Sequence, residues 1–493
     1  MVYYVEVAGS LILSVTDVRD LGSRRELFVD DWLIHRLESL ELRLHYPIQR
    51  EVALTFDRPW EGPGSYDPVI TKEGDRYRLW YRGWPKGATW SNASTCYAES
   101  AESADGITWE RPNLGLFEID GSRENNVVIQ GTSGVAVCVF RDQNPAAAET
   151  YKAIGKHTGR YQARQQGIPT ENRDGIRGLV SADGIHWSHL DRDPIIPPPP
   201  GDRWPFYDTH NVAFWDPNHG HYVAYLRGFI PPGLRAIRRA TSPDFREWTY
   251  PELIDMGDAP VEQLYKNAAT LYFRAPHLYL MFPKRFMEER KAILEHADTG
   301  VSDAVFMTSR DGIHWNRRFK EAFIRPGVDA ENWTDRNMYV GVGVVPTGPK
   351  EISLYHVEHY DHPTCRLRRV TLRTDGFASV HANYGGGELV TRPLVFSGDT
   401  LEINYATSAA GSVQVEIQDA EGRPFPGYQL SRSAPIYGDA IDHRVTWPGG
   451  VGNFLQLRGS DVGPLASQPV RLRFILKDAD LYSFCFTSAE PAG

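Results

Sequence analysis

The stretch Ser181-Ala-Asp183-Gly-Ile-His-Trp187 recurs along the first three quarters of this 493-residue chain in the pattern Ser-x-Asp-x-x-x-Trp. Further copies are Ser103–Trp109, Ser242–Trp248 and Ser309–Trp315, and a degraded fifth copy is Arg373–Phe377. Their aspartates stand about 60 to 80 residues apart, a spacing that indicates one repeated structural unit per copy. The chain is therefore expected to contain five such units.

Each copy has the chemistry of a hairpin turn. An Asp side chain accepts backbone N–H groups within the turn, Gly tolerates positive φ, and the Trp opens the next strand and packs between sheets. Strand-like runs precede the turns, such as Asp67–Lys72 and Arg76–Arg82 in the first unit. Four strands in each of five units predict an all-β fold, a five-bladed β-propeller.

The length of the chain indicates more than one domain, because a single core rarely grows beyond about 250–300 residues. A Gly-rich hinge, Gly385-Gly386-Gly387, follows the last repeat, and short strand patterns such as Thr400–Ala406, Ser412–Gln418 and Asn453–Arg458 come after it. We expect a propeller catalytic domain over 61–384 and a C-terminal β-sandwich over 385–493. Residues 1–60 are expected to form an N-terminal arm that packs on the propeller.

Composition argues against several partners. The formal net charge is −10, so a nucleic acid partner, which needs clustered Lys and Arg, is not expected. No run of about 18 apolar residues exists, so no membrane span is expected. The short apolar stretch Val7–Val15 lacks a basic region before it and is not a convincing signal peptide. Localisation and oligomeric state stay open.

The two faces of the predicted propeller carry different residues. The Asp turns join strands three and four, and we interpret their aspartates as structural. The opposite face holds the start of the first strand, which lines the channel, and the end of the second strand. Candidates there are Asp67, Asp208, Glu262, Asp335, Arg82, Arg227, Lys284, Arg285, His356 and Glu358. A single Asp at a strand start is commonly a turn residue, but the joint placement favours glycoside hydrolysis, which needs two carboxyl groups.

These residues resemble those of the five-bladed propeller glycosidases, the group that contains glycoside hydrolase families 32, 43, 62 and 68. In that group acidic residues recur on blades one, three and four in the order Asp, Asp, Glu, which matches Asp67, Asp208 and Glu262. A propeller followed by a sandwich is most similar to family 32, but the motifs diverge. Tyr66-Asp67-Pro68 stands for its first block, with Phe28-Val29-Asp30-Asp31 as a rival, and Tyr207-Asp208-Thr209 and Glu262-Gln263 replace the others.

The resemblance implies a hydrolase of furanosides or related glycosides, with Asp67, Asp208 and Glu262 as catalytic residues. Glu262 is expected to be the general acid, with its pKa raised by burial against Tyr265 and Asp208, while Asp67 stays ionised as nucleophile or base. The residues expected to bind the sugar are Tyr66, Arg82, His210, Asn211, Arg227, Tyr265, Asn267, Arg285, Asp335, Arg336, His356 and Glu358.

Two other functions stay open. A phosphorylase similar to propeller family 130 would need an anion site, built from residues such as Arg82, Arg227, Lys284, Arg285 or Arg336. A carbohydrate-binding protein without catalysis would bind sugar through the same face. No cofactor and no metal are expected: Tyr355–His362 is rich in metal-ligand residue types, but His356 and His359 would point to opposite faces of a strand.

Overall fold

The computed structural model describes residues 18–88, 96–131, 136–158, 174–190, 194–197, 207–447 and 461–488. Within these ranges the chain is strand and loop, with only short 3-10 helices such as Ala330–Asn332. No helix in the described ranges has the length and apolar character that crossing a membrane requires. The chain divides into two compact units: unit 1 is Met1–His45 with Asp375–Gly493, and unit 2 is Tyr46–Thr374.

Unit 2 begins with three antiparallel sheets of four strands each. The first holds β6 (Tyr66–Glu73), β7 (Arg76–Gly83), β8 (Tyr97–Ser103) and β9 (Val127–Gln130). The second holds β10 (Cys138–Arg141), β11 (Tyr151–Thr158), β12 (Asp174–Ser181) and β13 (Ser188–His189). The third holds β14 (Val212–Asp216), β15 (His221–Ile230), β16 (Leu234–Ser242) and β17 (Glu252–Leu253).

The next stretch of unit 2 forms two smaller sheets. One holds β19 (Thr270–Tyr272), β20 (Ala275–Met281), β23 (Met307–Ser309) and β24 (Trp315–Asn316), and the other holds β18 (Leu264–Tyr265), β21 (Lys284–Met287) and β22 (Val301–Ala304). Only Phe282 and Pro283 separate β20 from β21, and Pro283 has no N–H to donate to a ladder. β20 and β21 are therefore two parts of one extended segment, which Pro283 divides between the two sheets.

The last sheet of unit 2 combines distant parts of the sequence. It holds β25 (Tyr339–Val340), β26 (Val345–Gly348), β27 (Glu351–Glu358) and β28 (Arg366–Arg373), and β5 (Ile48–Thr55) pairs with β28 at its edge. The predicted arm over 1–60 is thus divided, because only its final part joins unit 2. Its strands β1 (Arg19–Gly22), β2 (Glu26–Leu27), β3 (Ile34–Glu38) and β4 (Leu40–Leu44) pair within unit 1.

The repeated turns join the third and fourth strands of their sheets, as predicted. In one copy the Ser181 Oγ accepts the Gly184 N–H at 2.9 Å, and Asp183 Oδ1 accepts the Ile185 and His186 N–H groups at 2.9 and 2.8 Å. The neighbouring sheet also contributes, because Trp80 on β7 donates to the Gly184 carbonyl at 3.0 Å. The carboxylates of these turn aspartates therefore accept hydrogen bonds from backbone N–H groups of the same turn.

The same link to the preceding sheet recurs at other copies. Tyr225 on β15 donates to the Gly312 carbonyl at 2.8 Å, and Tyr355 on β27 donates to the Gly106 carbonyl. The degraded copy differs: Asp375 belongs to unit 1, where Ser483 donates to its carboxylate at 2.7 Å. Hydrogen bonds to these turns thus connect each of these sheets of unit 2 with a neighbouring sheet.

The sheets of unit 2 surround a cavity. Successive sheets touch in chain order, through β6 with β10, β10 with β14, β16 with β18, and β22 with β25. The last sheet meets the first, because β26 and β27 contact β6 and Val69 pairs in parallel with Val342. A cavity of about 380 Å³ is lined by the inner strands, including Val139, Ala213 and Ala269. The functional candidates lie where these inner strands begin.

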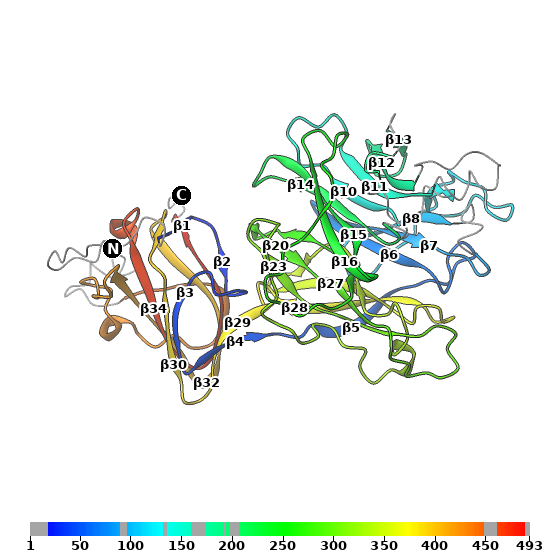
Figure 1. Ribbon diagram of the computed structural model, residues 1–493. Helices are drawn as coiled ribbons and strands as arrows, with labels where there is room; N and C mark the ends of the chain where they lie inside the picture. Colours follow the sequence, from blue (N-terminus) through cyan, green and yellow to red (C-terminus); the bar gives the residue numbers. More distant parts are fainter. Residues whose placement is uncertain are drawn as a thin grey trace, which may run out of the picture. The chain divides into compact units, whose positions relative to one another are not determined.

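Unit 1 is built on two long paired strands, β32 (Thr400–Asp419) and β34 (Val470–Thr487) (Figure 1). The sequence predicted two strands where β32 is continuous, with a register shift between Thr407 and Ser412. The other strands of this ten-stranded sheet are β29 (Ala378–Ala382), β30 (Gly387–Thr391), β31 (Leu394–Phe396), β33 (Asp439–Arg444) and β1 to β4. The expected strand Asn453–Arg458 lies outside the described residues.

Candidate active site at the start of the inner strands

Left-handed backbone marks the entry to each inner strand of unit 2. The residues concerned are Asp67 (φ 60°), Ala136 (53°), Tyr207 (59°), Lys266 (57°) and Arg336 (64°). Positive φ is uncommon outside glycine, and residues held in such conformations gather at active sites and ligand clamps. Five successive segments therefore turn in the same way at one end of the cavity, and three of these turns carry a charged side chain.

Asp67 is the central carboxylate of this group. Its side chain is 1% exposed, Lys266 donates to its Oδ1, and Arg82 Nη1 lies 3.2 Å from its Oδ2. Burial raises the pKa of Asp67, but the charges of Arg82 and Lys266 lower it more, so the net pKa lies below the usual range. Asp67 is therefore ionised at neutral pH, as its predicted role requires.

Lys266 is the partner that the sequence did not single out. Its Nζ lies 3.8 Å from the Tyr66 ring centre and 4.5 Å from that of Tyr339. Burial lowers the pKa of Lys266 to about 7, although Asp67 opposes this. The available signal was that Lys266, like Asp67, lies close to the start of a first strand, four residues before β19.

Lys284, on β21, is fully buried. Its Nζ donates to the Tyr265 hydroxyl at 2.6 Å and lies 3.4 Å from the Tyr66 hydroxyl. Within the described part of the chain no carboxylate lies within 4.0 Å of this nitrogen. Burial and the charge of Lys266 hold its pKa well below the usual value. The site thus contains a buried amine without a counter-ion.

Asp208 lies nearer to solvent, with its side chain 32% exposed. Lys156 Nζ lies 2.5 Å from its Oδ1, and Arg227 Nη1 lies 3.7 Å from its Oδ2. Arg227 also donates to the Asp208 carbonyl at 2.6 Å and lies 5.0 Å from the Tyr265 ring centre. Asp208 and Arg227 therefore connect the Tyr265 region with the solvent.

Glu262 has different neighbours from those expected. Arg285 Nη1 lies 3.3 Å from its Oε1, and Arg317 lies against its Oε2. Arg285 also binds Asp303 at 2.6 Å. Among the described residues, the ion pairs of Glu262 thus go to arginines rather than into the Asp67 group. Glu262 therefore belongs to a cluster with Arg285 and Arg317.

Asp335 lies closer to the Asp67 group. Its side chain is 5% exposed, and it is bound by Arg336 Nε at 2.8 Å and His296 Nε2 at 3.2 Å. The Tyr66 hydroxyl donates to the Arg336 carbonyl, which connects this segment to the residue beside Asp67. The charge of Asp335 also acts on buried Lys284, whose pKa it raises against the effect of burial.

Several residues that were predicted to bind the sugar form hydrogen bonds with the protein's own backbone carbonyls. His210 bonds to the Tyr339 hydroxyl and to the Val137 carbonyl, and its burial lowers its pKa to about 4. Asn211 donates to the Tyr207 and Thr209 carbonyls at 3.1 and 2.8 Å. Asn267 donates to the Tyr225 carbonyl at 3.0 Å. These side chains hold the loops of the site in place.

His356 and Glu358 form a separate charged group at the end of β27. Arg366 Nε and Arg368 Nη2 bind Glu358 Oε2 at 2.7 and 3.0 Å. His356 Nε2 lies 3.9 Å from Glu358 Oε1, and burial lowers the pKa of this histidine to about 4. The rival carboxylates Asp30 and Asp31 belong to unit 1.

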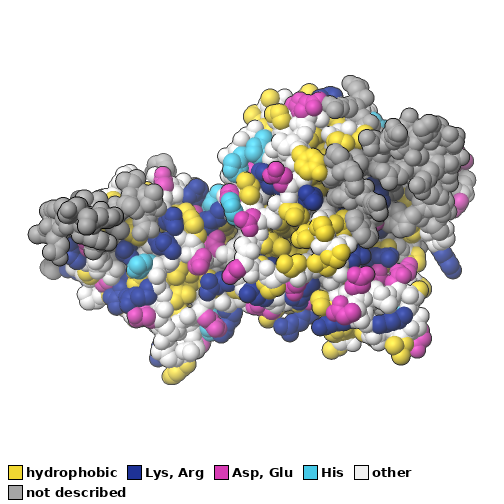
Figure 2. Space-filling view, viewed as in Figure 1, with side chains coloured by type: hydrophobic (Ala, Val, Ile, Leu, Met, Phe, Trp, Pro, Cys, Tyr) yellow, Lys and Arg dark blue, Asp and Glu magenta, His cyan; other side chains and the backbone are white. Residues whose placement is uncertain are grey.

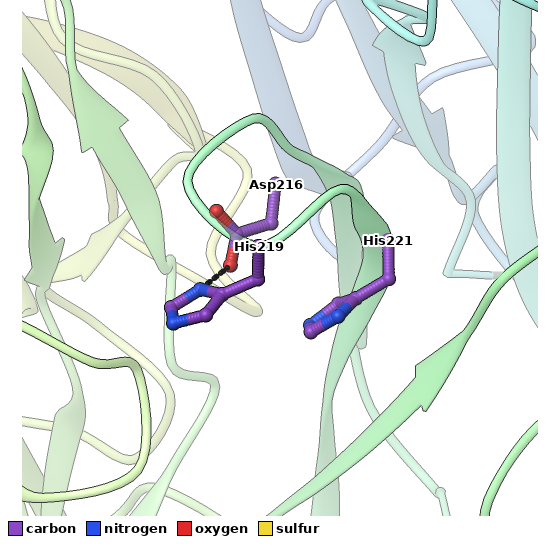
Figure 3. A group of neighbouring side chains, drawn as sticks. All are labelled: Asp216, His219 and His221. Atoms are coloured by element: carbon purple, nitrogen blue, oxygen red, sulfur yellow. Dashed lines mark hydrogen bonds and ion pairs between the residues drawn. The ribbon is translucent and has the colours of Figure 1, made fainter.

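One group of possible metal ligands lies on the β14–β15 hairpin (Figure 3). The ligand atoms of Asp216, His219 and His221 lie within 4.8 Å of one another. Asp216 already accepts from Asn218 N at 3.0 Å, from Tyr279 and from His219 Nδ1 at 2.9 Å. We interpret these residues as a hydrogen-bonded group that stabilises the hairpin.

Comparison with known proteins finds no sequence match and weak structural similarity. No protein-family model and no curated protein matches it. Solved structures with some similarity include a glycoside hydrolase (13% identity, TM-score 0.45, 66% of this chain and 92% of that one). An N-acetylgalactosamine deacetylase from F. plautii (14%, 0.44, 68% and 96%) and a Bombyx mori GH32 beta-fructofuranosidase (11%, 0.40, 91% and 95%) are similar as well. Likeness of this size assigns neither activity nor substrate.

Proposed function

We propose that unit 2 is a five-bladed propeller that hydrolyses a glycosidic bond, in a furanoside or related glycoside, where its inner strands begin. A left-handed residue within or a few residues before each of five first strands supports five blades, with the two smaller sheets counted as one interrupted blade. The contacts of β26 and β27 with β6 support a closed ring. The propeller would bring residues from distant parts of the sequence to one channel end.

The main support for the proposal is the state of Asp67. This side chain is a buried carboxylate that Arg82 and Lys266 keep ionised, from the first and fourth blades. A glycosidase needs such a group either to attack the anomeric carbon or to activate water. Asp208, which is partly exposed and held by Lys156, would orient the sugar at the mouth.

The proton donor is assigned to Asp335 rather than to Glu262. Asp335 is the more deeply buried of the two and adjoins the segment that Tyr66 binds. Its contact with His296 Nε2 provides a partner from which a proton can be replaced after each turnover. Glu262 then stabilises its own loop through Arg285 and Arg317.

A panel of aryl furanosides and aryl pyranosides, with matching alkyl glycosides, tests the proposal. Asp67→Asn should abolish hydrolysis of both kinds. Asp335→Asn should slow the alkyl glycosides by at least about 10²-fold and spare the activated aryl glycosides, because a good leaving group needs little protonation. Glu262→Gln is the matched control and should retain activity. Full activity in folded Asp67→Asn protein would refute the proposal.

The alternatives remain distinguishable in the same assay. A phosphorylase would turn over only with inorganic phosphate present, and the cations Arg82, Arg227 and Lys284 favour testing this. A binding protein would show no turnover and would keep its sugar affinity in Asp67→Asn.

A further inference from the structure

Two tyrosines of the site are surrounded by cations. The Tyr265 ring centre lies 4.1 Å from Lys284 Nζ, 5.0 Å from the Arg227 guanidinium carbon and 5.3 Å from that of Arg235. The Tyr66 ring centre lies 3.8 Å from Lys266 Nζ and 5.8 Å from Lys284 Nζ. The faces of aromatic rings attract cations, but they do not replace counter-ions.

Carboxylates in the same place are too few to balance these charges. Asp67 serves both Arg82 and Lys266. Asp335, whose charge acts on Lys284 from more than 4.0 Å, is bound by Arg336 at 2.8 Å. Asp208 serves Lys156 at 2.5 Å and reaches Arg227 only at 3.7 Å. Lys284 has only two phenol oxygens as partners among the described residues, at 2.6 and 3.4 Å. The shortage of carboxylate partners for the cations is therefore greatest at Lys284.

A buried ammonium group without an anion is costly, so it loses its proton or binds an anion. A merely structural position could be filled by an apolar side chain at lower cost. Lys284 instead shares the Tyr265 ring with Arg227 and contacts Tyr66, the residue before Asp67. Three ammonium hydrogens meet two phenol oxygens, which leaves one donor for an incoming group.

We propose that the substrate carries an anionic group, a carboxylate or a sulfate or phosphate ester, that binds Lys284 and Arg227 beside Tyr265. This inference rests on the proposed function only for its location at the catalytic group. The anion would supply the missing counter-ion of Lys284, and Arg227 would offer it a planar pair of donors. A neutral furanoside would leave Lys284 unpaired and should bind more weakly.

Calorimetric titration of the intact chain tests this inference without any need for turnover. The probes are D-glucuronate, its neutral counterpart D-glucose, inorganic phosphate and sulfate, each measured at pH 8 in two buffers of different ionisation enthalpy. Glucuronate should bind at least about tenfold more tightly than glucose, with uptake of a proton, because Lys284 becomes protonated. Phosphate binding without glucuronate binding would identify a free anion as the ligand.

Lys284→Met and Lys284→Gln should each weaken anion binding at least about tenfold and remove proton uptake. Lys72→Met is the matched control, because Lys72 also lies over a tyrosine ring, 5.4 Å from the centre of Tyr77, but is exposed. Equal anion affinity in folded Lys284→Met and wild-type protein overturns the inference, as does the failure of every anion to bind. Hydrolysis of neutral glycosides without anion binding would support the proposed function and refute only this inference.

Discussion

Replacing Asp67 with Asn should lower the pKa of Lys266 further below its value of about 7. Burial depresses that pKa from 10.5, and the contact with Asp67 is the largest opposing effect. A pKa of about 7 instead of 10.5 already corresponds to roughly 5 kcal/mol of destabilised charge. A unit charge at about 4 Å, with an effective dielectric of about 20, contributes roughly 4 kcal/mol, so its loss should lower the pKa by about 2 to 3.

The measurement is a pH titration of protein labelled with ¹³C at the lysine Cε, followed by NMR. One resonance should titrate near pH 7 in the wild type, disappear in Lys266→Met, and titrate at a lower pH in Asp67→Asn. Lys266→Met assigns the signal, and exposed lysines titrating near 10.4 act as internal references. A Lys266 signal that titrates with the exposed lysines, or that does not move in Asp67→Asn, would refute the reasoning.

The same pair sets the sign of a pH effect on folding. Because the pKa of Lys266 is lower in the folded state than in the unfolded state, the unfolded chain binds more protons between about pH 7 and 10.5. This residue therefore makes stability rise with pH across that window. The lowered pKa of Asp67 acts at the other end: it contributes stability above the ordinary pKa of Asp, and this is lost as pH falls through the folded value.

Further predictions concern packing. Trp315→Ala should destabilise the protein by about 3–5 kcal/mol in chemical unfolding, because its ring is 2% exposed; Trp187→Ala should cost less, since that ring is only partly buried, and equal losses would contradict this. Gly83→Ala should unfold or strongly destabilise the chain, because its Cβ would lie 1.7 Å from a carboxylate oxygen of buried Glu99; Gly348→Ala, whose nearest contact is at 3.5 Å, should keep the wild-type melting temperature.

The sequence determined the local structure of the repeats. Ser181, Asp183 and Gly184 interact within a few residues of one another, so their turn can be derived from side-chain chemistry alone. The position of Asp67 at the start of an inner strand followed from counting strands between such turns. Its ionised state, however, depends on neighbours that this counting does not place.

Only the tertiary structure decided which charges meet. Lys266 lies 199 residues from Asp67 in the sequence, and their contact exists because segments of two different sheets come together at this site. Glu262 satisfied the same sequence criterion as Asp67, yet Arg317, on a later loop, binds it. Turn chemistry acts over a few bonds and is written in the sequence, whereas burial and ion pairing depend on which sheets pack together and on what each side chain faces when they do.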